Sequence, residues 1–135
     1  MAAPDREVSL TRLYLMRALC VFVAAWGFLN VLPGLMDHEP DARGVFASMV
    51  GGLWIVACFG IRYPLQILPL FLLEFTWKSV WFLAFGLPQW ISGVGSPQLK
   101  QDLMDIGAFP LVMAVFIPWG YVWRHYVKAP GERWR

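Results

Sequence analysis

Charged side chains are scarce in this sequence. Aspartate, glutamate, lysine and arginine make up 15% of its 135 residues, whereas soluble domains typically carry about 25%. Hydrophobic residues make up 59%, and a domain this small could not bury them all, because small domains bury too little of their surface. The net charge of +2 is too small to indicate a nucleic-acid partner. The composition therefore predicts a membrane protein whose apolar side chains face lipid.

Cysteine and histidine are also rare, with two residues of each. Cys20 and Cys58 lie in separate apolar stretches without CxxC spacing, so we interpret them as small packing residues, with a redox pair as the alternative. His38 and His125 are expected on opposite sides of the membrane, where they cannot share a haem or a metal. The sequence also lacks a phosphate-binding loop and a nucleophile constellation. We therefore expect no cofactor, no metal and no catalytic residue.

Long apolar stretches are what the sequence does contain, and a membrane-crossing helix needs about 20 such residues. The stretches cover residues 13–32, 45–61, 65–87 and 106–122. Pro33 and Gly34 are expected to end the first, and the segment from Pro88 to Pro97 has the glycine, proline and serine content of a loop. The prediction is a single all-α domain, an integral membrane bundle of four antiparallel transmembrane helices.

The distribution of basic residues predicts the orientation, because lysine and arginine in short loops mark the cytoplasmic side. With four crossings, the two tails and the middle loop share one side. Eight basic residues fall there: Arg6, Arg12, Arg17, Arg62, Arg124, Lys128, Arg133 and Arg135. The other side has two basic and five acidic residues: Arg43 and Lys100, with Asp37, Glu39, Asp41, Asp102 and Asp105. Both termini are therefore predicted to be cytoplasmic.

Glu74 and Lys78 interrupt the third apolar stretch. A charge at the bilayer centre costs at least about 2.5–3.5 kcal/mol, so the two residues need a reason to be there. Residues four apart share a helix face, and glutamate before lysine is the favourable order. One interpretation is a buried intrahelical ion pair, and a second is a proton or ligand site at Glu74. A third is that the Lys78 side chain extends to the membrane interface while Glu74 pairs with another group. Four apolar neighbours are expected to wall such a site or to pack between helices: Leu70, Phe71, Trp77 and Trp81.

Small residues recur at four-residue intervals early in the second stretch, at Gly44, Ser48 and Gly52. This spacing places them on one helix face, where another backbone can approach closely. We expect the face to pack against a helix of the same chain, with a dimer interface as the alternative.

Three prolines, Pro69, Pro110 and Pro118, lie inside the predicted spans. Each lacks the N–H that would bond the carbonyl four residues earlier, so each can bend its helix. Neighbouring helices or water can satisfy the freed carbonyls.

The second half of the chain resembles a group of small bacterial four-span membrane proteins of unassigned function. The resemblance rests on the run from Leu73 to Trp81 and on the end of the chain from Ile117 to Trp134, and it covers roughly residues 62–135. It implies a bacterial inner-membrane location and a multi-pass topology.

Three classes of function are compatible with these features. The first is a non-catalytic interaction protein, an accessory subunit or oligomer, with membrane lipid, a second copy or a larger membrane complex as partners. The second is a binder or carrier of a small apolar molecule or of protons, using Glu74 and Lys78. The third, a membrane enzyme or redox partner, lacks an acid, base or nucleophile cluster in its favour and ranks last.

Overall fold

The computed structural model describes residues 8–36 and 40–131, and every regular element within them is helical. The α-helices are α1 (Leu10–Met36), α2 (Ala42–Cys58), α3 (Leu68–Trp81), α4 (Leu87–Ile91), α5 (Pro97–Asp102), α6 (Phe109–Phe116) and α7 (Trp119–Val122). Several of these helices continue into a short segment of another helix type. The segment η2 (Phe59–Ile61) is a 3-10 helix, and η3 (Phe82–Gly86), η4 (Leu103–Gly107) and η5 (Trp123–Val127) are π-helical turns. The predicted all-α class is confirmed. Seven residues used in the sequence argument lie outside the described ranges: Arg6, Asp37, His38, Glu39, Arg133, Trp134 and Arg135.

Three helical segments are long and apolar enough to cross a membrane: Leu10–Met36, Ala42–Ile61 and Leu68–Ile91. A fourth is possible by composition if Pro97–Phe116 and Trp119–Val127 form one span, but these two pieces meet at an angle of 78°. Large apolar side chains such as Phe28, Leu83 and Leu111 are exposed along the helices. These features indicate a membrane protein with three or four spanning segments.

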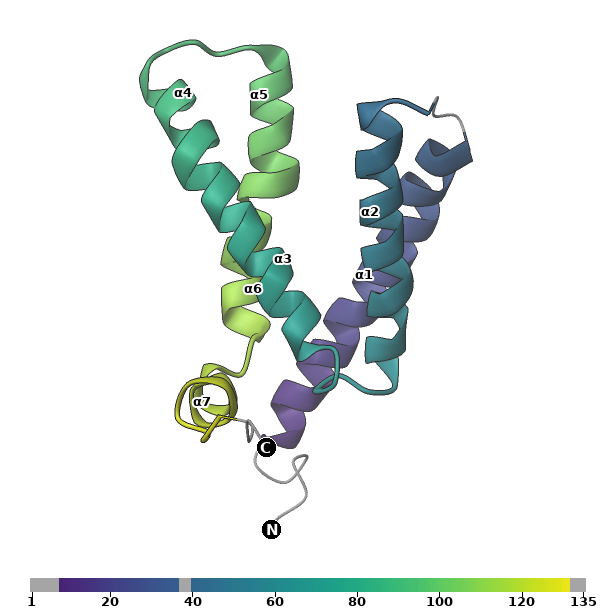
Figure 1. Cartoon of the computed structure of the whole chain (residues 1–135), viewed down its shortest axis with the longest axis vertical. Helices are drawn as coiled ribbons and strands as arrows, with labels where there is room; N and C mark the ends of the chain where they lie inside the picture. The colour runs from purple at the N-terminus through teal and green to yellow at the C-terminus, as the bar shows by residue number, and fades with distance from the viewer. Residues whose placement is uncertain (1–7, 37–39, 132–135) are drawn as a thin grey trace.

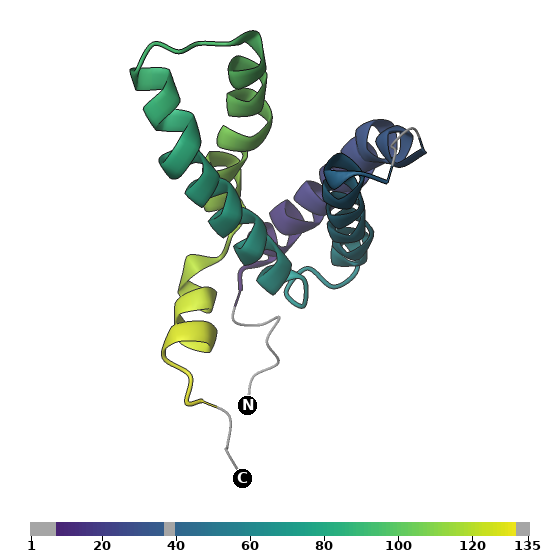
Figure 2. The same ribbon diagram turned by 45° about the horizontal axis from the view of Figure 1, so that its top comes forward.

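The helices form two hairpins arranged as a V (Figure 1). One arm is α1 with α2, and the other is α3 and α4 with α5 and α6. The arms also diverge in the turned view of Figure 2, and α7 is seen end-on below α6 in Figure 1. A buried cluster that includes Met16, Cys20, Phe71, Met113 and Ile117 joins α1, α3 and α6. The described residues therefore form two splayed hairpins, and the predicted bundle of four antiparallel helices is not confirmed.

Two predicted helix ends are wrong. α1 continues through Pro33 and Gly34 to Met36, because a proline removes only one backbone hydrogen bond and membrane helices tolerate that loss. The expected loop at Pro88–Pro97 is also shorter than predicted, since α4 extends to Ile91. The chain turns at Gly93, whose φ of 73° lies in the left-handed region that glycine adopts without strain.

The fourth segment begins nine residues earlier than the predicted start at residue 106. Ser96 accepts a hydrogen bond from the backbone N–H of Leu99 at 3.0 Å, and Pro97 occupies the first turn. Serine at the N-cap followed by proline is a helix-start signal. The 20-residue piece Pro97–Phe116 would span about 30 Å as a helix, which is enough to cross the hydrocarbon core without α7.

Pro118 marks the break after α6. It disfavours helical geometry at the preceding residue, and Ile117 is accordingly extended (φ −64°, ψ 128°). The Arg12 guanidinium of α1 donates to the Ile117 carbonyl at 2.8 Å, a favourable position for a cation at a helix C-terminus. The Ala114 carbonyl, freed by Pro118, accepts from the Trp119 indole N–H at 2.7 Å. Pro69 and Pro110 instead occupy first turns of helical segments, where the missing N–H has no helical partner to lose.

The close contact between α1 and α2 uses other glycines than we predicted. A side chain at Gly27 would overlap the indole of Trp54, which donates to the Ala24 carbonyl at 3.0 Å. A Cβ at Gly51 would lie 2.7 Å from the Leu35 side chain, whereas one at Gly52 would have nothing within 4 Å. The helix partner that the sequence suggested for Gly52 is therefore not α1, which approaches the neighbouring side of α2.

Ser48 belongs to the same predicted face. Ser48 is exposed, and its hydroxyl donates to the Gly44 carbonyl of its own helix at 2.8 Å. Whether the face of Gly44, Ser48 and Gly52 meets a second chain stays a prediction.

Candidate functional site

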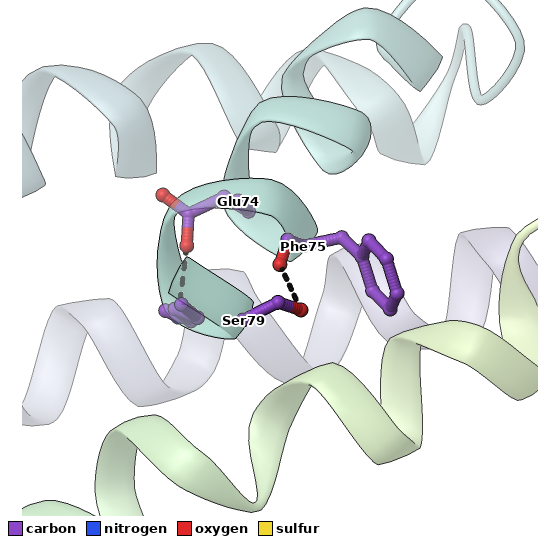
Figure 3. A network of polar contacts seen from close by, with 4 residues as sticks. Glu74, Phe75 and Ser79 are labelled. Atoms are coloured by element: carbon purple, nitrogen blue, oxygen red, sulfur yellow. Dashed lines mark hydrogen bonds and ion pairs between the residues drawn. The ribbon is translucent and has the colours of Figure 1, made fainter. Parts of the chain in front are cut away.

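Glu74 and Lys78 lie one turn apart on α3, and their side chains form an ion pair. The distance from Lys78 Nζ to Glu74 Oε2 is 2.8 Å, with the side chains only 13% and 15% exposed, respectively. Figure 3 shows the Glu74 carboxylate on one side of the helix, with the Ser79 hydroxyl donating to the Phe75 carbonyl beside it at 2.6 Å. Because the Ser79 hydroxyl donates within its own helix, it is not an unsatisfied polar group that faces lipid. The ion pair is thus the main polar feature on this part of α3.

Aromatic rings cover the ammonium group of Lys78. Its Nζ lies 3.8 Å from the centroid of the Phe109 ring on α6 and 5.3 Å from the Trp77 ring. The negative face of an aromatic ring attracts a cation, and more strongly where water is excluded. Phe109 and Glu74 together therefore enclose the positive charge and fix the Lys78 side chain between α3 and α6.

The helix boundaries determine how deep the pair lies in the third spanning segment. A helix counted from Pro64 would place Glu74 close to the midplane of the span, but the residues before Leu68 form turns and α3 begins at Leu68. At about 1.5 Å per residue, Glu74 lies about 9 Å and Lys78 about 15 Å along the continuous segment Leu68–Ile91. Lys78 is therefore closer to the middle of that segment than Glu74.

A cleft of about 240 Å³ lies between the two arms of the V, with the ion pair in its wall. Residues from both hairpins line it, and most of them are apolar or aromatic. They include Phe22 and Trp26 of α1, Leu53 and Trp54 of α2, Leu70, Phe71, Glu74 and Lys78 of α3, and Asp105 and Phe109 of the second arm. Mostly apolar walls with a few polar groups are typical of small-molecule sites.

The four aromatic and aliphatic neighbours expected around the pair separate into two groups. Leu70 and Phe71 line the cleft, whereas Trp77 and Trp81 do not. Trp81 packs near Gly86, where an added Cβ would come within 3.0 Å of its ring. The buried indole nitrogen of Trp77 has no hydrogen-bond partner among the described residues. These two tryptophans therefore belong to the packing of the second arm.

Part of the cleft was not predicted from the sequence, above all Asp105. We expected Asp105 among the acidic residues on the non-cytoplasmic side, but it lies in the π-helical turn η4, where the Ala108 N–H donates to the Leu103 carbonyl at 3.0 Å. The Ser96–Pro97 start signal could have located Asp105 inside a helix. The contributions of Trp26 and Trp54 could not be read from the sequence, because they depend on how the first arm faces the second.

Two π-helical turns lie against each other in the second arm. A Cβ at Gly86, which ends η3, would come within 3.1 Å of Leu103, and a Cβ at Gly107, which ends η4, within 3.0 Å of Phe82. Both glycines are buried, and their missing side chains let the turns approach. π-Turns within α-helices occur frequently at functional sites, and here they set the position of Asp105 relative to α3.

No known family model, no curated protein and no solved structure matches this chain. We therefore infer the function from the cleft and its charged residues. Neither Cys20, which is buried, nor Cys58 is in a disulfide.

Proposed function

We propose that this protein binds a small, largely apolar molecule in the cleft between its two helical hairpins. The observation that carries the proposal is the cavity of about 240 Å³, whose mostly apolar wall includes the Glu74–Lys78 ion pair. An apolar lining favours ligands that partition into the bilayer, and the ion pair provides a polar group that can orient them. Ionisable residues inside membrane segments commonly mark substrate or ion pathways.

We also propose four antiparallel crossings of a bacterial inner membrane, with both termini cytoplasmic. The eight-to-two bias of basic residues supports this orientation, and the length of Pro97–Phe116 supports a fourth crossing that ends before α7. Trp119–Val127 would then lie along the cytoplasmic surface, where tryptophan and tyrosine are favoured.

Reporter fusions test this topology. An alkaline phosphatase domain fused after Arg135 should be inactive, and one inserted in the loop at Gly95 should be active, because that enzyme folds only outside the cytoplasm. Activity of the fusion after Arg135 would contradict the model of four crossings with a cytoplasmic amino terminus.

Photolabelling tests binding in the cleft. The apolar carbene reagent trifluoromethyl-(m-iodophenyl)diazirine should label cleft-lining peptides of the purified protein in a saturable manner, in addition to lipid-facing positions. Leu70→Trp, which fills the cleft, should remove the saturable component. The matched control is Leu73→Trp, on the same helix but 53% exposed and outside the cleft, and it should label like the wild type. Identical labelling of all three proteins would refute the proposal.

A second candidate function is assembly into an oligomer or a larger membrane complex. The open space beside Gly52 and the exposed Ser48 favour it, because small residues on an outward helix face allow another helix to approach closely. The two functions are compatible, since this face is separate from the cleft-lining residues.

A further inference from the structure

The charges that line the cleft do not balance. Glu74, Lys78 and Asp105 are its charged lining residues, and Lys78 is paired with Glu74 at 2.8 Å. Asp105 is hydrogen-bonded instead to a neutral group, the amide of Gln101, at 2.9 Å. Two carboxylates therefore face one ammonium group, which leaves one negative charge in an otherwise apolar site.

We infer that the cleft selects ligands with one positive charge, namely compact lipophilic amines or similar organic cations, whose charged group lies against Asp105. This inference rests on the proposed function, because it specifies the ligand of the same cleft. A charge in surroundings of low dielectric is stabilised chiefly by an opposite charge nearby. A cationic ligand supplies that partner to Asp105, whereas an anionic ligand would meet two carboxylates.

Lys78 is poorly placed to attract an anion in compensation. Glu74 contacts its ammonium group, the Phe109 ring covers it at 3.8 Å, and only 13% of the side chain is exposed. The positive charge of the cleft is therefore enclosed, whereas Asp105 is exposed.

The aromatic residues of the cleft favour the same class of ligand. Phe22, Trp26, Trp54, Phe71 and Phe109 all contribute to its lining. The faces of such rings attract organic cations, and tryptophan does so most strongly. Phe109 already holds the ammonium of Lys78 in this way. An amine with an apolar body can thus use the rings for both parts of the molecule.

The size of the cleft restricts the ligand further. A volume of about 240 Å³ is just below the range of about 300–1,000 Å³ that holds drug-sized molecules. The ligand is therefore a compact amine with one or two rings or a short chain, and a whole phospholipid is too large.

Competition among three molecules of nearly the same shape tests the charge selection. Using the full chain in uncharged maltoside micelles, 1-naphthylmethylamine, 1-naphthalenemethanol and 1-naphthoate would compete with the carbene reagent for the cleft. We expect the amine to displace the label at concentrations about tenfold lower than the alcohol, as one charge-assisted contact would give. The carboxylate should be the weakest competitor.

Variants at Asp105 show whether this residue is the source of the selectivity. Asp105→Asn should remove the advantage of the amine over the alcohol, and Asp105→Glu, which keeps the charge, should retain it. The matched control is Asp102→Asn, since Asp102 accepts from Gln98 in the same way at 3.0 Å but does not line the cleft. Each compound partitions into the micelles to the same extent whichever variant is present. Comparing its competition between proteins therefore removes the effect of partitioning.

The outcomes separate this inference from the proposed function. Equal competition by all three compounds, or an amine advantage that survives in Asp105→Asn, would overturn the charge selection and leave apolar binding intact. If none of the compounds displaces a label that is saturable in the wild type, the charge selection fails and apolar binding stands. If the wild type and Leu70→Trp label identically, binding in the cleft itself fails, and the inference fails with it.

Discussion

Removing one member of the Glu74–Lys78 pair should lower the free energy of unfolding by about 3–5 kcal/mol, because an uncompensated charge is left in a mostly buried position. The changes are Glu74→Gln and Lys78→Met, and the double variant should recover much of the loss, since replacing both partners of a buried pair is often neutral. The small exposed fractions of the two side chains place this pair among buried ones. Unfolding by SDS titration from mixed micelles measures each free energy.

A matched control for this experiment is Lys100→Met on the exposed surface of α5, which should change the stability little. Single variants as stable as this control would contradict a buried, mutually neutralising pair. The double variant also separates structure from function. If it is stable but no longer shows saturable labelling of the cleft, the pair contributes to the ligand site in addition to stabilising the fold.

The same substitution at two glycines of α1 and α2 should have opposite results. Gly27→Leu should destabilise the protein by at least about 1–3 kcal/mol, the usual effect of overpacking, because its side chain would displace the Trp54 indole from the Ala24 carbonyl. Gly52→Leu meets open space, and leucine is a better helix former than glycine by about 1 kcal/mol, so its stability should be unchanged or slightly higher. SDS titration again provides the measurement.

Particle mass adds a second result from the same variants. If Gly52→Leu keeps its stability but native mass spectrometry shows a smaller particle than the wild type, the face of Gly44, Ser48 and Gly52 is an interface between chains. An unchanged mass would assign this face to lipid and remove the support for the assembly function. A Gly27→Leu protein as stable as Gly52→Leu would contradict the packing of α1 against α2.

Local features of this protein were largely determined by its sequence. The helical class and the approximate positions of the first three spanning segments follow from apolar runs, because a backbone in lipid must satisfy its hydrogen bonds internally. The Glu74–Lys78 contact is also local, since residues four apart on one helix lie on the same face. The start of the last segment was present as well, in the Ser96–Pro97 signal, although we read it as a loop.

Tertiary structure decided what the sequence left open. All three candidate prolines could bend a helix, but the break lies at Pro118, where Arg12 from the far end of the chain and Trp119 bond the carbonyls that the break frees. The cleft likewise needs two hairpins held apart at a particular angle. Its walls come from residues as distant in sequence as Phe22 and Phe109, and no periodicity within a helix specifies how far one hairpin lies from the other. That separation depends on long-range packing around Met16 and Met113, and only this packing places Asp105 in the same cavity as the ion pair.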